Sequence, residues 1–127
     1  MAIERVSETP GANRRLFPRF EVMEYACLRA SMDGREENCV IVDVSLGGLQ
    51  ARCKQSFPVG STYFVEIGGA QASSLVIQAE VKYCVPLDGT DLIATGLRVS
   101  SNDRHALRQW VDFVRAIFET QAESLED

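Results

Sequence analysis

The stretch LIATGLRVSSNDRHALRQWVDFVRAIF, from Leu92 to Phe118, changes its hydrophobic period part-way along. Its first part predicts a β-strand, inside which Gly96 indicates a bulge or a close backbone approach. From Asp103 to about Gln121 the apolar residues recur at helical spacing and form one stripe along a helix. The stripe consists of Leu107, Trp110, Val111, Val114, Ile117 and Phe118. Three polar residues could cap the start of this helix: Ser101, Asn102 or Asp103.

Five further segments upstream have β-strand character. They are about Phe20–Ser31, Asn38–Ser45, Leu49–Cys53, Thr62–Ile67 and Ser74–Val85. Turn signals such as Asp33-Gly34 and Gly68-Gly69 separate them. Strands and helices do not alternate along the chain, and there is no internal repeat. About six short strands followed by one helix predict an all-β domain, an antiparallel barrel or curled sheet with the helix over one end.

Alternation predicts which side chains share a face of each strand. In the second strand one face would carry Cys39, Ile41, Asp43 and Ser45. In the strand after Gly48 the inner face would carry Leu49, Ala51 and Cys53. In the longest strand one face would carry Leu75, Ile77, Ala79, Val81, Tyr83 and Val85. Trp110 and Phe118 of the helix are expected to lie against this sheet.

Composition predicts a single cytoplasmic domain. The chain has 127 residues with a formal net charge of −5 and a pI of about 4.9, whereas general nucleic-acid binders are usually basic. Residues 1–19 lack the apolar run of a signal peptide, and no apolar stretch is long enough to span a bilayer. Residues 1–13 are expected to be a flexible arm, residues 14–120 the domain and residues 121–127 an acidic tail.

The residue inventory argues against catalysis and against a metal site. The four cysteines are Cys27, Cys39, Cys53 and Cys84, and none of them forms a CxxC pair. Their apolar neighbours predict buried free thiols in a reducing compartment. The single histidine, His105, lies at the start of the predicted helix and is expected at the surface. With no nucleophile–base pair and no metal-ligand spacing, the sequence predicts a protein that is not an enzyme and binds no metal.

A cluster of arginines precedes the first strand, in the segment RRLFPRF at residues 14–20. Taken alone, such a run is most often a solvated basic segment. Here Pro18 stiffens the backbone, and Phe17 and Phe20 can anchor it on the domain. The arginines would then be held in place, where a guanidinium can pair with phosphate, with the O6/N7 edge of guanine, or stack on a base.

A second cluster, DVSLGG at residues 43–48, lies where two predicted strands meet. Alone, it is most simply explained as a turn with side-chain capping bonds. Asp43 and Ser45 project from the same face, and Gly47 and Gly48 could adopt positive φ or let a ligand approach the backbone. A carboxylate can accept hydrogen bonds from guanine N1–H and N2–H together. The two clusters together therefore fit a ligand that has both phosphates and guanine bases.

The two clusters, in this order and spacing, resemble the PilZ domain, the bacterial cyclic di-GMP receptor module. Its RxxxR pattern matches Arg15 to Arg19, and its [DN]xSxxG pattern matches Asp43 to Gly48. Gly96 also stands where family members often have a glycine in the last strand. The resemblance covers roughly residues 13–120 and implies a six-stranded antiparallel β-barrel with a C-terminal α-helix.

The resemblance implies roles for individual residues. Arg15 and Arg19 would grip phosphates and guanine, Asp43 and Ser45 would contact a guanine, and Gly48 would keep the floor of the site open. Gly47 belongs to the same predicted site. Arg14 precedes the motif, where family members that bind an intercalated pair of cyclic di-GMP molecules tend to have an arginine.

The sequence thus predicts a non-catalytic cyclic di-GMP receptor that has no cofactor, signals to an unidentified effector protein, and is a monomer or a ligand-linked dimer. It would bind neither DNA nor RNA and would not insert into a membrane. One alternative is a PilZ-like protein-interaction module that does not bind nucleotide. Another is a small-barrel nucleic-acid binder, which the net charge of −5 disfavours.

Overall fold

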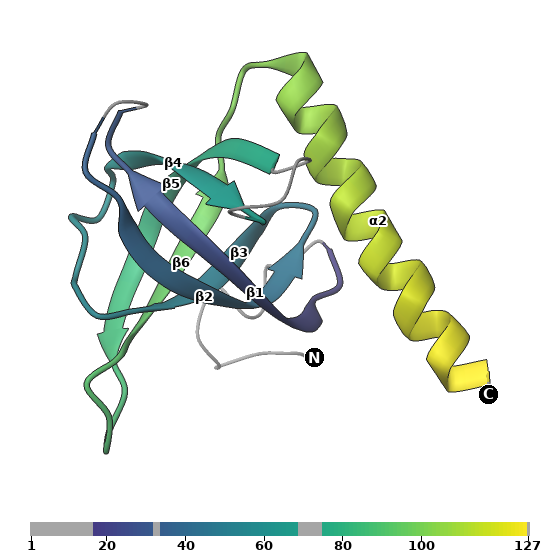
Figure 1. Ribbon diagram of the computed structural model, residues 1–127, viewed down its shortest axis with the longest axis horizontal. Coiled ribbons are helices and arrows are strands. Elements are labelled where there is room, and N and C mark those ends of the chain that lie inside the picture. The colour runs from purple at the N-terminus through teal and green to yellow at the C-terminus, as the bar shows by residue number, and fades with distance from the viewer. Residues whose placement is uncertain (1–16, 32–33, 69–74, 127) are drawn as a thin grey trace, which may run out of the picture.

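The computed structural model describes residues 17–31, 34–68 and 75–126, which fold into a closed antiparallel barrel of six strands with one helix beside it (Figure 1). The strands are β1 (Phe20–Arg29), β2 (Glu37–Ser45), β3 (Gly48–Cys53), β4 (Thr62–Ile67), β5 (Leu75–Pro86) and β6 (Ile93–Val99). The helix α2 spans Arg104–Glu126. The predicted fold, an all-β six-stranded antiparallel barrel with a C-terminal helix, is confirmed.

The barrel consists of two meanders joined along both sides. Around the barrel the strands follow the order β1-β2-β3-β6-β5-β4, and β1 closes it by pairing with β4. Closure leaves no unpaired strand edge among these six strands, which removes the usual template for aggregation. It also brings the β2–β3 turn beside the end of β6, because Gly48 pairs with Arg98.

Apolar side chains from every strand fill the interior. The largest that are almost wholly buried are Leu28, Ile41, Val44, Leu49, Val65, Ile77 and Val81, together with Trp110 of the helix. The predicted faces of β3 are confirmed: Leu49, Ala51 and Cys53 are buried, whereas Gln50 and Arg52 are partly exposed. The interior is therefore a packed core, as is typical of a small barrel.

The predicted faces of β2 and β5 are wrong in part, because each strand contains an irregularity. In β2 the register shifts between Ile41 and Asp43, so Ile41 is buried while Asp43 is half-exposed on the outer surface. In β5 it shifts between Val81 and Tyr83, so Val81 is buried and Tyr83 lies outside. A bulge inserts one extra residue and reverses the alternation beyond it, which a strict period of two cannot reproduce.

The helix begins at a capped N-terminus and runs further than predicted. Asp103 Oδ1 accepts hydrogen bonds from the backbone N–H groups of His105 and Ala106, at 2.9 and 3.3 Å. This confirms the prediction that one of Ser101, Asn102 and Asp103 caps the helix. The expected end near Gln121 is too early, because α2 continues to Glu126. Its last residues contain no glycine or proline that would stop a helix.

The remaining predictions about single residue types are largely confirmed. Cys27, Cys39 and Cys53 are buried free thiols, whereas Cys84 is only half-buried. A hydrogen bond with Cys53, together with burial, raises the pKa of the Cys39 thiol. His105 is exposed.

Within the described part of the chain, no helix is both long and apolar enough to cross a membrane.

Candidate functional site

The β2–β3 turn is held in place from two sides. Ser45 pairs with Gly48, so Leu46 and Gly47 form a two-residue loop. The backbone N–H of Val99 donates to the carbonyl of Gly47 at 2.9 Å, and the indole Nε1–H of Trp110 donates to the carbonyl of Leu46 at 3.0 Å. Strand β6 and helix α2 thus fix the backbone of the DVSLGG cluster.

The glycines of this turn serve packing rather than unusual backbone torsion. Among the described residues, positive φ occurs at Gly60, Gly68 and Gly89, and therefore not at Gly47 or Gly48. A Cβ added to Gly48 would lie 2.2 Å from the carbonyl oxygen of Leu97. The space beside the Cα of Gly48 is therefore filled by β6. An open floor at Gly48 was expected, and this space does not provide it. A larger residue at Gly48 would push β3 away from β6.

An ion pair joins the two sequence clusters. Arg19 Nη1 donates to Asp43 Oδ1 at 2.7 Å, and the two side chains are 29% and 24% exposed. The Nε–H of Arg19 is buried and has no hydrogen-bond partner among the described residues. Because the Arg19 side chain is partly exposed, its guanidinium can offer further donors to an incoming acceptor, whereas the Nε–H first has to be uncovered.

Phe17 and Phe20 anchor the arginine segment, as predicted. The Phe17 ring lies over Gly47, since a Cβ added there would be 3.3 Å from Phe17 Cδ2. The Phe20 ring contacts Phe118 of α2, with centroids 5.6 Å apart. Both ends of the segment from Phe17 to Phe20 are thus fixed against the turn and the helix. Arg14 and Arg15, also predicted for the site, lie outside the described residues.

Asp43 and Ser45 differ in access although they are two residues apart after the bulge. Asp43 is half-exposed, with its carboxylate toward Arg19. Ser45 is only 5% exposed. In this arrangement Asp43 is available to a ligand, and Ser45 becomes available only if the residues that cover it move.

Two residues that the sequence did not single out lie in line with Asp43. Strand pairing places Asp43, Gln50, Gly96 and Tyr83 in one transverse row across β2, β3, β6 and β5. Gln50 Nε2 donates to the Tyr83 hydroxyl at 2.9 Å, and a Cβ on Gly96 would lie 2.1 Å from Tyr83 Cε2. The predicted close approach at Gly96 is therefore made by the Tyr83 ring, which extends the polar surface beyond Asp43.

An apolar groove lies between the arginine segment and the helix. Its volume is about 240 Å³, and it is lined by Pro18, Phe20, Leu46, Val114, Arg115 and Phe118. It therefore borders both sequence clusters. In the described part of the chain, no group of three His, Cys, Asp or Glu side chains is placed to hold a metal ion.

Comparison with known protein families identifies the fold. The family model described as PilZ domain matches residues 13–116, a span that contains both clusters and most of the helix. The chain belongs to the PilZ domain family. Among curated proteins, no sequence matches.

Several solved structures share the fold at low sequence identity. The PilZ domain of YcgR from Escherichia coli with c-di-GMP aligns with a TM-score of 0.66 and 18% identity, over 90% of this chain and 98% of that one. The inhibitor of motility MotI/DgrA of Bacillus subtilis aligns at 0.67 and 14%, over 87% and 52%. The K. pneumonia MrkH–c-di-GMP complex aligns at 0.65 and 17%, over 87% and 53%. The chain spans about half the length of the last two.

Proposed function

We propose that this PilZ domain is a non-catalytic receptor for cyclic di-GMP that passes the binding event to a partner protein in the cytoplasm. Arg19 and Asp43 would form the centre of its binding site. Arg14 and Arg15 would complete the phosphate contacts from the segment that precedes Phe17. Ser45, Gly47 and Gly48 form the turn beneath, and Tyr83 with Gln50 extends the surface along the same row.

The Arg19–Asp43 pair is the observation that carries this proposal. It brings a donor for phosphate or for the guanine O6/N7 edge within hydrogen-bond distance of an acceptor for the guanine Watson–Crick edge. The buried Nε–H of Arg19 has no partner among the described residues, and a shift of the residues that cover it would make it available to the ligand. The YcgR and MrkH structures with bound c-di-GMP show that barrels of this fold bind that nucleotide, which supports the same ligand here.

The contacts between the site and α2 support a route for signalling. Trp110 donates to the Leu46 carbonyl within the turn, and Gln121 Nε2 donates to the Glu21 carbonyl at 2.7 Å. Phe118 contacts Phe20 one residue beyond Arg19. Any ligand-induced shift of residues 17–21 or of the turn would therefore alter these contacts with the helix. A partner protein could recognise the repositioned arm, the helix, or the groove between them.

Cyclic di-GMP is expected to order the arginine segment. Three arginines that close over one dianion would exchange solvent contacts for charge-assisted hydrogen bonds and lose backbone freedom. Amide hydrogen exchange at residues 14–19 should slow by about tenfold or more when the nucleotide is added. Exchange in the core of β5 serves as an internal control and should stay unchanged. Unaltered exchange at residues 14–19 under saturating ligand would exclude this order–disorder switch.

Asp43 is expected to provide selectivity for guanine. Its carboxylate can accept from guanine N1–H and N2–H, which adenine lacks, so the wild-type chain should bind cyclic di-GMP in preference to cyclic di-AMP. Asp43→Ala should lower cyclic di-GMP affinity by about tenfold or more, since a hydrogen bond to a charged group contributes about 1.5–3 kcal/mol. The preference over cyclic di-AMP should shrink in parallel. Competition binding with both dinucleotides measures this, and equal affinity of the wild-type chain for the two would refute the proposed ligand.

A further inference from the structure

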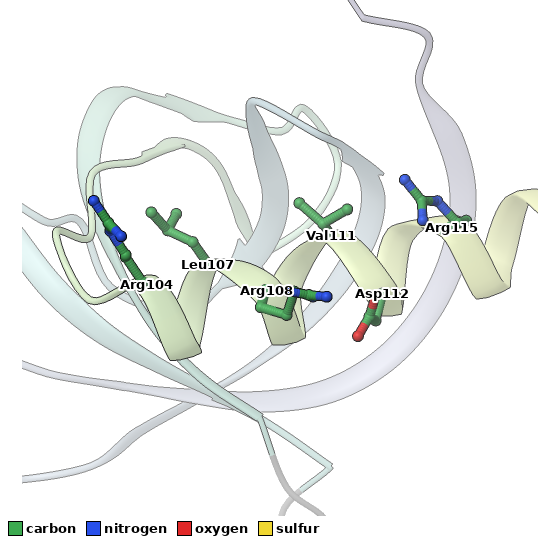
Figure 2. A pocket seen from close by; sticks show the side chains of 6 residues that line it. All are labelled: Arg104, Leu107, Arg108, Val111, Asp112 and Arg115. Atoms are coloured by element: carbon green, nitrogen blue, oxygen red, sulfur yellow. The ribbon is translucent and has the colours of Figure 1, made fainter.

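Helix α2 carries a charged stripe on the side away from the barrel. The stripe comprises Arg104, Arg108, Asp112, Arg115 and Glu119, which recur every three or four residues and are all exposed. Trp110 and Val114, on the opposite side of the helix, are buried against the barrel. Figure 2 shows the first four stripe residues along successive turns of α2, together with Leu107 and Val111. The stripe therefore lies outside the barrel core, and one of its residues, Arg115, also lines the apolar groove beside the site.

The stripe has an apolar border, and its charges form no ion pair with the residues that the structure describes. A shallow groove of about 440 Å³ is lined by Leu107 and Val111 and by the four charged residues from Arg104 to Arg115. Leu107 and Val111 are half-buried, and Phe118 further along the helix is 52% exposed. None of the five stripe residues forms an ion pair with another described residue, although salt bridges occur on the barrel. The groove thus offers a basic surface with some apolar area and no partner within the described chain.

The charge on this helix reverses along its length. Residues 104–115 contain three arginines against one aspartate, whereas residues 119–126 contain three glutamates and no base. Because both halves belong to one continuous helix, the acidic half is not folded back onto the basic half of the same chain. An antiparallel second helix of the same sequence would complement both halves at once. A self-complementary patch of this kind is what a two-fold symmetric interface requires.

We infer that two copies of this protein associate through antiparallel pairing of their α2 helices. A register centred between residues 113 and 114 places Arg104 level with Glu123 of the partner copy and Arg108 level with Glu119. The same register places Asp112 level with Arg115, and symmetry repeats all three matches. Leu107, Val111 and Phe118 border this contact and would lose solvent exposure in it. Arg115 and Phe118 also line the apolar groove beside the nucleotide site. The charge matches need no nucleotide, so the interface forms without cyclic di-GMP and does not depend on the proposed function.

Charge reversal with mixing provides a direct test, measured by sedimentation velocity on the full chain without nucleotide. The wild-type chain is expected to dimerise, and to dissociate when salt rises from about 0.1 to 1 M, because screening shortens the range of charge interactions from about 10 to 3 Å. An acidic variant, Arg104→Glu with Arg108→Glu, should dimerise about tenfold or more weakly. A basic variant, Glu119→Arg with Glu123→Arg, should be weakened likewise. Both exchanges keep good helix formers, so circular dichroism should be unchanged.

The equimolar mixture of the two variants is the decisive sample. One variant then has a stripe that is acidic except at Arg115, and the other has a stripe that is basic except at Asp112. A heterodimer should therefore form at least as tightly as the wild-type dimer. The control pair Arg35→Glu with Lys54→Glu lowers the net charge by the same amount as the acidic variant, at exposed positions on the barrel, and should dimerise like the wild-type chain. A wild-type chain that stays monomeric at about 100 μM would overturn the inference, as would variants that fail to weaken dimerisation or a mixture that stays monomeric.

Discussion

Trp110→Ala should lower the free energy of unfolding by about 3–5 kcal/mol, a large part of the stability of a domain of this size. Trp110 is 1% exposed, and its ring packs on Phe113 with centroids 5.6 Å apart. The substitution would leave a cavity between the helix and the barrel. It would also remove the donor to the Leu46 carbonyl, which loosens the β2–β3 turn. Urea unfolding followed by circular dichroism measures the loss.

Trp110→Phe separates these two effects. Phenylalanine retains much of the apolar volume but has no N–H, so the partly buried Leu46 carbonyl would lose its donor. We expect a loss of about 1–3 kcal/mol, smaller than that of the alanine variant. If Trp110→Ala cost less than about 1 kcal/mol, α2 would not be packed on the barrel as described. The proposed route from the site to the helix would then have no physical basis.

Arg19→Ala should weaken cyclic di-GMP binding by about 100-fold. Alanine would remove the proposed contacts to the nucleotide, which should contribute about 1.5–3 kcal/mol each, and every 1.4 kcal/mol is a factor of ten in affinity. It also removes the hydrogen bond that orients the Asp43 carboxylate. Equilibrium binding of labelled cyclic di-GMP measures the change. Arg19→Lys should recover only part of the affinity, because lysine lacks the planar fork of the guanidinium.

Arg35→Ala is the matched control for a general loss of positive charge. Arg35 is 85% exposed and pairs with Glu37 at the opposite end of the β1–β2 hairpin from the site. Its removal should leave cyclic di-GMP affinity within about twofold of wild type. Equal losses in Arg19→Ala and Arg35→Ala would show that the nucleotide responds to overall charge, and the assigned site would be wrong.

The fold could be predicted from the sequence because its main signals are local. Alternating residues in the strands, glycine-rich turns, and the change of period after Ser100 each report on a few neighbouring residues. The bulges after Ile41 and Val81 could not be predicted, because they depend on how one strand fits the next. Because of these bulges, Tyr83 lies outside the barrel and not on the buried face with Val81. Asp43 likewise does not share the buried face of Ile41.

The candidate site was predictable in part for a similar reason. Two short motifs identified Arg19 and Asp43, and strand pairing then placed them in contact. Gln50 and Tyr83 carry no motif of their own, because their position beside Asp43 follows from the β3–β6–β5 register. Gly96 was the available signal, since a glycine inside a strand indicates that something approaches it closely. The sequence could not indicate that Tyr83 was that neighbour.

Calorimetric titration of the wild-type chain with cyclic di-GMP is the decisive measurement of the proposed receptor function, because it reports affinity and stoichiometry together. We expect saturable binding of one nucleotide per chain, or of two if Arg14 helps to hold an intercalated pair. No binding at about 100 μM cyclic di-GMP would contradict it. The domain would then be a PilZ module whose Arg19–Asp43 pair serves structure alone.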